Sequence, residues 1–121
     1  SLDEIFAALD KDIERAIGQA VARKAIADRY GKRLIAYEAG QHLVTPDVEL
    51  NKKIQRDPRM GKLYSRYLAE WRKRVGDRMM LFSSTSAIGR HGAWGMREYS
   101  GQSEADAPKL AAVKAFMADL R

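Results

Sequence analysis

The sequence predicts a helix-rich α/β fold for residues 1–121, taken as a single unit. Three observations support this prediction. Apolar residues recur at helical spacing over most of the chain, two short apolar runs rich in strand formers interrupt that spacing, and helical stretches separate the two runs. Two apolar strands joined through helices describe a βαβ unit with a parallel sheet. The predicted order is helix, strand, helices, strand, loop, helix.

The first predicted element is a long helix over residues 2–30. Its apolar residues follow one another at helical spacing from Leu2 to Val21, and Gly31 supplies the stop. The next run, 33–38, is apolar and rich in strand formers, and a turn-like segment follows it. This run therefore predicts a buried strand.

Two helices are predicted next, over residues 46–55 and 58–75. Each begins where a residue suited to an N-cap precedes a proline, at Thr45 and at Asp57. The second helix has the clearest apolar stripe in the chain, and the stripe includes Trp71. We therefore expect Trp71 to lie in the core.

A second strand, a long loop and a last helix complete the predicted order. Residues 78–83 form the second short apolar run, and 84–103 are rich in Ser, Gly and aromatic residues without clear periodicity. Pro108 then opens a helix over 108–120. A structureless loop of that length inside a small domain indicates either a functional segment or a wrong assignment of the elements.

Composition excludes several classes of protein and of site. Hydrophobic residues make up 45 % and charged residues 31 %, which is typical of a globular domain and excludes wholesale disorder. Cysteine is absent, which excludes disulfides, thiolate zinc sites and cysteine nucleophiles. No apolar run suits a membrane span and no signal peptide is visible. Because the chain begins with Ser1, we expect a processed or trimmed product or a piece of a longer polypeptide, and the sequence indicates no compartment.

The charge balance is basic, with 22 Lys and Arg residues against 16 acidic residues and a net charge of +6. Such a balance indicates nucleic-acid binding only where the basic residues cluster on one face. The densest basic run, 72–74, lies between Glu70 and Asp77, which is typical of a solvated helix face. A basic nucleic-acid-binding domain that uses this run is therefore the least favoured alternative.

Polar side chains follow both predicted strands at their carboxyl ends, where α/β proteins place their sites. The first strand ends in Tyr37 and Glu38 and runs into Gln41 and His42, and the loop after the second strand carries Trp94. A carboxylate that closes an apolar strand is costly to place unless it lies in a cleft or has a partner. Glu38 is therefore a candidate catalytic carboxylate. The alternative is that it caps a neighbouring helix or pairs with an arginine.

Three stretches carry a resemblance to a known family. They are AYEAGQHLV at 36–44, RDPRM at 56–60 with LY at 63–64, and GAWG at 92–95 followed by Tyr99 and APK at 107–109. They resemble the C-terminal portion of bacterial glycoside-hydrolase-like (β/α)8 barrels, and the similarity spans nearly the whole chain. These barrels belong with retaining glycosidases, which carry one glutamate at the end of strand four and another at the end of strand seven.

The resemblance implies roles for the polar residues after the strands. Glu38 would occupy the nucleophile position at the end of strand seven, and Trp94 would form the aromatic platform against which a sugar ring stacks. Tyr37, Gln41 and His42 would bind the carbohydrate, the last two at the rim, where its hydroxyl groups need donors and acceptors. No cofactor or metal is implied.

The same resemblance implies that the chain is catalytically incomplete alone. A barrel takes eight strands and about 250 residues, whereas this sequence has 121 residues and predicts only two strands. Retention needs a second carboxyl group about 5 Å from the first, and in the family it comes from an upstream strand. We therefore expect a C-terminal segment that acts on or binds carbohydrate once the remainder of the barrel, or further copies of the chain, supplies the other strands.

Other interpretations are open from the sequence. A non-catalytic helical module could self-associate through the apolar stripe of the 58–75 helix. Glu38, His42 and His91 are suitable ligand types for zinc or iron, although no helical spacing pairs the histidines. No Gly-x-Ser-x-Gly motif supports a serine hydrolase, and the glycines of the loop are too widely spaced to hold a phosphate. Trp94 is either a core residue or a ligand platform.

Overall fold

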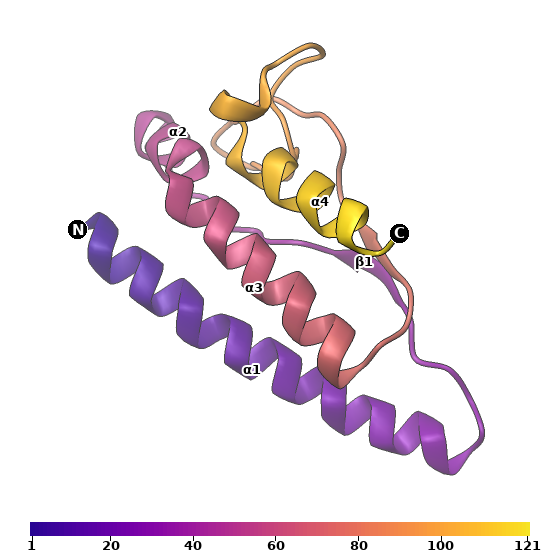
Figure 1. Ribbon diagram of the computed structural model, residues 1–121. Helices are drawn as coiled ribbons and strands as arrows, with labels where there is room; N and C mark the ends of the chain where they lie inside the picture. The colour runs from indigo at the N-terminus through magenta and orange to yellow at the C-terminus, as the bar shows by residue number, and fades with distance from the viewer.

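A computed structural model describes residues 1–121 (Figure 1). The chain is helix-rich α/β, as predicted, with four α-helices and two parallel strands. In chain order the elements are α1 (Leu2–Arg29), β1 (Ala36–Ala39), α2 (Val48–Arg56), α3 (Pro58–Arg74), β2 (Met79–Leu81), the short 3₁₀ helix η1 (Glu104–Asp106) and α4 (Pro108–Asp119). None of the helices combines the length and the apolar character needed to cross a bilayer.

The predicted helices are present, and their ends follow local capping chemistry. Ser1 and Glu4 form a capping box at the start of α1, and the Asp57 side chain accepts a hydrogen bond at the start of α3, directly before Pro58. The prediction of Thr45 as the cap of α2 is wrong. The cap is Asp47, whose carboxylate accepts a hydrogen bond from the Leu50 N–H, so α2 begins two residues later than predicted.

Helix α3 is the centre of the structure, with α1 on one side and α4 on the other (Figure 1). Most of its apolar stripe is buried, including Met60, Tyr64 and Leu68, and Trp71 is only 8 % exposed, as predicted for a core residue. Two apolar clusters result, one built around Phe6, Ile54, Met60 and Tyr64 and one around Ile17, Trp71 and Val75. Most of this stripe therefore packs against other parts of the same chain.

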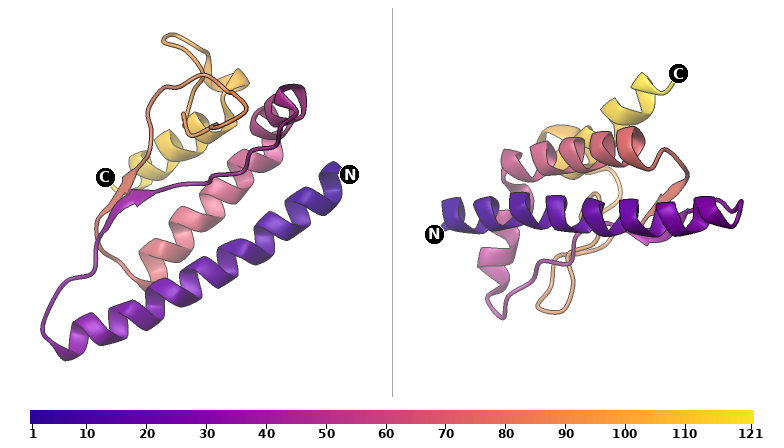
Figure 2. Two further views of the ribbon diagram at one scale, coloured as in Figure 1. Left: turned by 180° about the vertical axis from the view of Figure 1, so that it is seen from behind. Right: turned by 90° about the horizontal axis from the view of Figure 1, so that it is seen from below.

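The sheet is covered on one face only. Ala36 and Met79, a pair across the two strands, pack toward the cluster around Trp71. Seen from behind, the strands lie in front of the helices and no helix crosses over them (Figure 2). Side chains on the uncovered side are exposed, including Tyr37 at 83 % and Phe82 at 47 %. The prediction of a buried first strand is therefore wrong, because nothing in the chain covers its outer face.

The strands are also shorter than the predicted ranges 33–38 and 78–83. Pairing begins where the Ala36 N–H donates to the Arg78 carbonyl, and the residues before Ala36 have no neighbouring strand. It ends at the bond from the Phe82 N–H to the Ala39 carbonyl. A two-stranded sheet has no inner strand, so β1 and β2 each have one unpaired edge.

Candidate functional site

A bulge in β1 turns two consecutive side chains outward. Ala36 pairs with Met79 and Ala39 pairs with Leu81, so three steps along β1 oppose two steps along β2. Side chains alternate between the faces of a regular strand, and an extra residue interrupts this alternation. Tyr37 and Glu38 are consequently both exposed while Ala36 and Ala39 face inward.

Four of the five predicted site residues line one small hollow at the carboxyl end of the strands. Its volume is about 140 Å³, and its walls are Glu38, Ala39, Gly40, Gln41, His42, Phe82 and Trp94. The residues come from the end of β1, the segment after it, the residue after β2 and the loop beyond. Parallel strands end at the same edge of a sheet, which is why these segments meet. Tyr37 is not part of the wall.

Glu38 has neither of the structural roles that were open to it. It caps no helix, and its carboxylate takes part in no ion pair of the structure. It is also the only carboxylate in the wall of the hollow. The carboxylate is therefore free to meet a ligand there.

His42 and Trp94 form a hydrogen-bonded ring pair in the wall. The Trp94 Nε1–H donates to His42 Nδ1 at 2.7 Å, and the ring centroids are 4.7 Å apart. Because Nδ1 accepts, a neutral His42 carries its proton on Nε2, which can donate to a ligand hydroxyl. Phe82 meets the indole edge-on at 6.0 Å. The pair thus presents aromatic surface together with one N–H donor.

The loop that carries Trp94 is ordered by bonds between its two limbs. The Ser83 N–H donates to the Trp94 carbonyl, and the Met96 N–H donates back to the Ser83 carbonyl. Gly92 leaves room for the indole, since a Cβ at this position would lie 1.9 Å from Cζ3 of Trp94. The loop backbone and the missing side chain together determine where the indole lies.

Replacing Gly92 with alanine is expected to displace the Trp94 indole and break its bond to His42. The reason is steric, because the added methyl group would overlap the six-membered ring of the indole. The measurement is the indole N–H resonance of Trp94 in a ¹⁵N-labelled protein. Gly89→Ala is the matched control, since its Cβ would find its nearest neighbour at 4.0 Å. An unchanged Trp94 resonance in Gly92→Ala would contradict the prediction.

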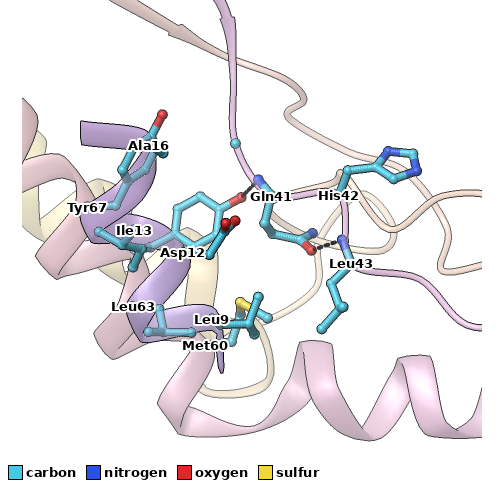
Figure 3. A pocket seen from close by; sticks show the side chains of 12 residues that line it. Leu9, Asp12, Ile13, Ala16, Gln41, His42, Leu43, Met60, Leu63 and Tyr67 are labelled. Carbon is cyan, nitrogen blue, oxygen red and sulfur yellow. Dashed lines mark hydrogen bonds between the residues drawn. The ribbon is translucent and has the colours of Figure 1, made fainter. Parts of the chain in front are cut away.

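Gln41, which was predicted to bind substrate, makes several hydrogen bonds to other residues of the chain. Its backbone N–H donates to the Tyr64 hydroxyl, and its Oε1 accepts from the Leu43 N–H (Figure 3). Its Nε2 donates to the Ala93 carbonyl at 2.7 Å, and its amide exchanges two further bonds with Gln55. Burial raises the pKa of Tyr64 to about 12, which keeps that hydroxyl protonated. We therefore assign the Gln41 amide to holding the wall of the hollow.

Two buried amides on α2, Asn51 and Gln55, support the same region and were not singled out from the sequence. Asn51 is fully buried and bonds the N–H and the carbonyl of Thr45 and the carbonyl of Gly89. It thereby joins the segment after β1 to the loop after β2. The signal in the sequence is a pair of amides four residues apart on one helix face, in a helix that also carries Ile54.

A second cavity, of about 240 Å³, lies between α1 and α3 beside the same segment (Figure 3). Most of its lining is apolar, with Leu9, Ile13 and Leu63 among its walls. The Asp12 carboxylate at its edge accepts two hydrogen bonds from Arg15. The cavity holds no group as free to react as Glu38, so the hollow is the better candidate for chemistry.

Two other interpretations lose support from the geometry. No three potential ligands lie close enough to hold a metal ion, so Glu38, His42 and His91 do not form a metal site. The basic run after Trp71 is partly neutralised. Arg74 lies 3.4 Å from Glu14, and Arg72 lies 3.6 Å from Asp119. Such pairing leaves less charge for a phosphate backbone.

The hollow provides part of what a retaining glycosidase needs. It holds one free carboxylate, an aromatic wall and an N–H donor, whereas retention requires a second carboxyl group about 5 Å from the first. No protein-family model, curated protein or solved structure matches the chain.

Proposed function

We propose that this chain is the C-terminal segment of a glycosidase-like (β/α)8 barrel that acts on carbohydrate. In this proposal Glu38 is the nucleophile and the ring pair of Trp94 and His42 binds the sugar. The observation that carries it is the convergence of Glu38, His42 and Trp94 on one hollow at the carboxyl end of two parallel strands. That edge is where barrels place their catalytic groups.

The chemistry of the hollow suits a sugar ring. A pyranose has an apolar face of C–H groups, which packs on an indole, and hydroxyl groups around its edge, which need donors and acceptors. Trp94 supplies the aromatic surface, His42 supplies a donor and Glu38 supplies an acceptor that can attack the anomeric carbon. The three groups therefore provide stacking, a hydrogen-bond donor and a nucleophile, which are the contributions expected from one side of a glycosidase site.

The size of the hollow supports a site that other strands complete. At about 140 Å³ it is smaller than usual ligand pockets, which span about 300 to 1,000 Å³. The sheet beside it has two unpaired edges and a face with no cover, whereas parallel sheets in stable proteins are covered on both faces. Strands from the remainder of a barrel would pair with these edges and bring the missing walls and the second carboxylate.

Replacing Trp94 with alanine in the complete polypeptide is expected to weaken carbohydrate binding about tenfold, which equals about 1.4 kcal/mol. The measurement is titration calorimetry against a panel of hexose and pentose oligosaccharides with α and β linkages. Tyr99→Ala is the matched control, because Tyr99 is 60 % exposed and lies outside the wall of the hollow. The proposal fails if the unaltered polypeptide binds none of the panel, or if both variants bind equally well.

A further inference from the structure

Lys109 is a buried cation that the proposed chemistry does not use. It is 3 % exposed, and its Nζ makes one hydrogen bond, to the Ala93 carbonyl at 2.8 Å. It lies in the first turn of α4, directly after Pro108, where the helix dipole opposes a positive charge. Burial lowers the pKa of Lys109 to about 8. A lysine that meets two unfavourable conditions at once calls for an explanation beyond packing.

Close packing of α4 on α3 determines where the ammonium lies. A Cβ at Gly61 would lie 2.8 Å from the Pro108 carbonyl oxygen, so the start of α4 lies very close to the backbone of α3. The Lys109 side chain extends from this contact past Tyr64, with Nζ 6.0 Å from the ring centroid. It ends beneath the loop that carries Trp94, where it meets the Ala93 carbonyl.

The Ala93 carbonyl is held from two sides. Gln41 donates to it from the segment after β1 at 2.7 Å, and Lys109 donates to it from α4 at 2.8 Å. Ala93 itself is 1 % exposed. Its carbonyl belongs to the peptide unit that leads into Trp94, so a fixed Ala93 carbonyl fixes the plane that contains the N and Cα atoms of Trp94, from which its side chain extends.

We propose that Lys109 is a positioning residue for the hollow. Its ammonium fixes the peptide unit between Ala93 and Trp94, so that the indole keeps its bond to His42 and presents its ring to a ligand. The inference rests on the proposed function in one respect, namely that a sugar ring is the ligand the indole receives. The alternative is a lysine that only fills space between α3 and α4.

The two roles are separated by Lys109→Met, which preserves the volume of the side chain and removes the donor. If Lys109 positions Trp94, the Trp94 indole N–H resonance moves toward that of a free indole and exchanges with solvent at least about tenfold faster, while the Trp71 resonance is unchanged. Trp94→Phe assigns the signal in the ¹⁵N-labelled complete polypeptide. Lys109→Gln, which retains an N–H donor, is expected to keep more of the original signal.

An unchanged Trp94 resonance in a folded Lys109→Met variant would overturn the inference. If that variant does not fold, Lys109→Gln decides in its place. Its amide N–H lies one bond nearer the backbone and bonds the Ala93 carbonyl less well, so an unchanged Trp94 resonance in this variant would contradict positioning by Lys109. Oligosaccharide binding separates this inference from the proposed function. If the polypeptide binds no sugar but the Trp94 indole resonance changes in Lys109→Met, the inference is supported and the proposed function is rejected. If the original polypeptide and Lys109→Met bind sugar equally well and the Trp94 resonance is the same in both, only the inference is rejected.

Discussion

Replacing Glu38 with glutamine is expected to lower turnover by the complete polypeptide about 10⁴-fold or more, which is the scale seen when a nucleophile is removed from an enzyme. Glutamine has nearly the same shape as glutamate but cannot attack an anomeric carbon as an anion. The Glu38 side chain is exposed and makes no ion pair, so the fold does not depend on its charge. The measurement is kcat on an aryl glycoside, together with a thermal melt.

The control for this change is Glu49→Gln. Glu49 is an exposed carboxylate on α2, held by Lys52 and outside the hollow, so removing its charge is expected to leave turnover within about twofold of the original value. Near-normal turnover in Glu38→Gln would reject Glu38 as the nucleophile. A parallel loss in both variants would show that the effect is not specific to the hollow.

The free energy of unfolding is expected to rise by about 2 kcal/mol between pH 8 and pH 10 because of Lys109. Burial lowers the pKa of Lys109 from its ordinary value of 10.5 to about 8 in the folded protein. Between these values the unfolded chain binds a proton that the folded protein has released, so stability increases with pH. Below pH 8 both states are protonated, and the full cost of burying the charge is present.

The measurement is chemical denaturation of the original protein and of Lys109→Met at pH 7.5 and pH 10. The groups that face the ammonium are the Tyr64 ring and the Glu98 carboxylate, and both favour the charged form, but burial outweighs them and lowers the pKa. Burial raises the pKa of Tyr64 from its ordinary value of 10 to about 12, so the contribution of Tyr64 to the free energy of unfolding falls only above pH 10. Taking the difference between the two proteins removes the contributions of other groups. Equal pH dependence in both would contradict the prediction.

The helices were predictable because their signals are local. Asp57 with Pro58 starts α3, apolar spacing identifies α1, and the apolar stripe of α3 identifies its buried face. Each signal depends on residues within a turn or two of one another. The error at α2 has the same origin, because Thr45 and Asp47 are both suitable caps, and the structure uses the second.

The position of Glu38 at a strand end was also evident from the order of apolar and polar residues. That it faces solvent together with Tyr37 was not, because a bulge is a property of two paired strands and not of one. The sequence contains only a weak indication that Lys109 is unusual, namely a lysine in the first turn of a helix. Its contact with Ala93, 16 residues away along the chain, depends on the packing of α4 on α3.

The sequence by itself determined the order and type of the elements and the residues that could react. Tertiary structure decided which of those residues meet. It gathered Glu38, His42 and Trp94 around one hollow, left Tyr37 outside it, and assigned the Gln41 amide to the scaffold. The physical reason is that capping and apolar spacing act along the chain, whereas register, close helix contacts and buried hydrogen bonds form only between segments that folding brings together.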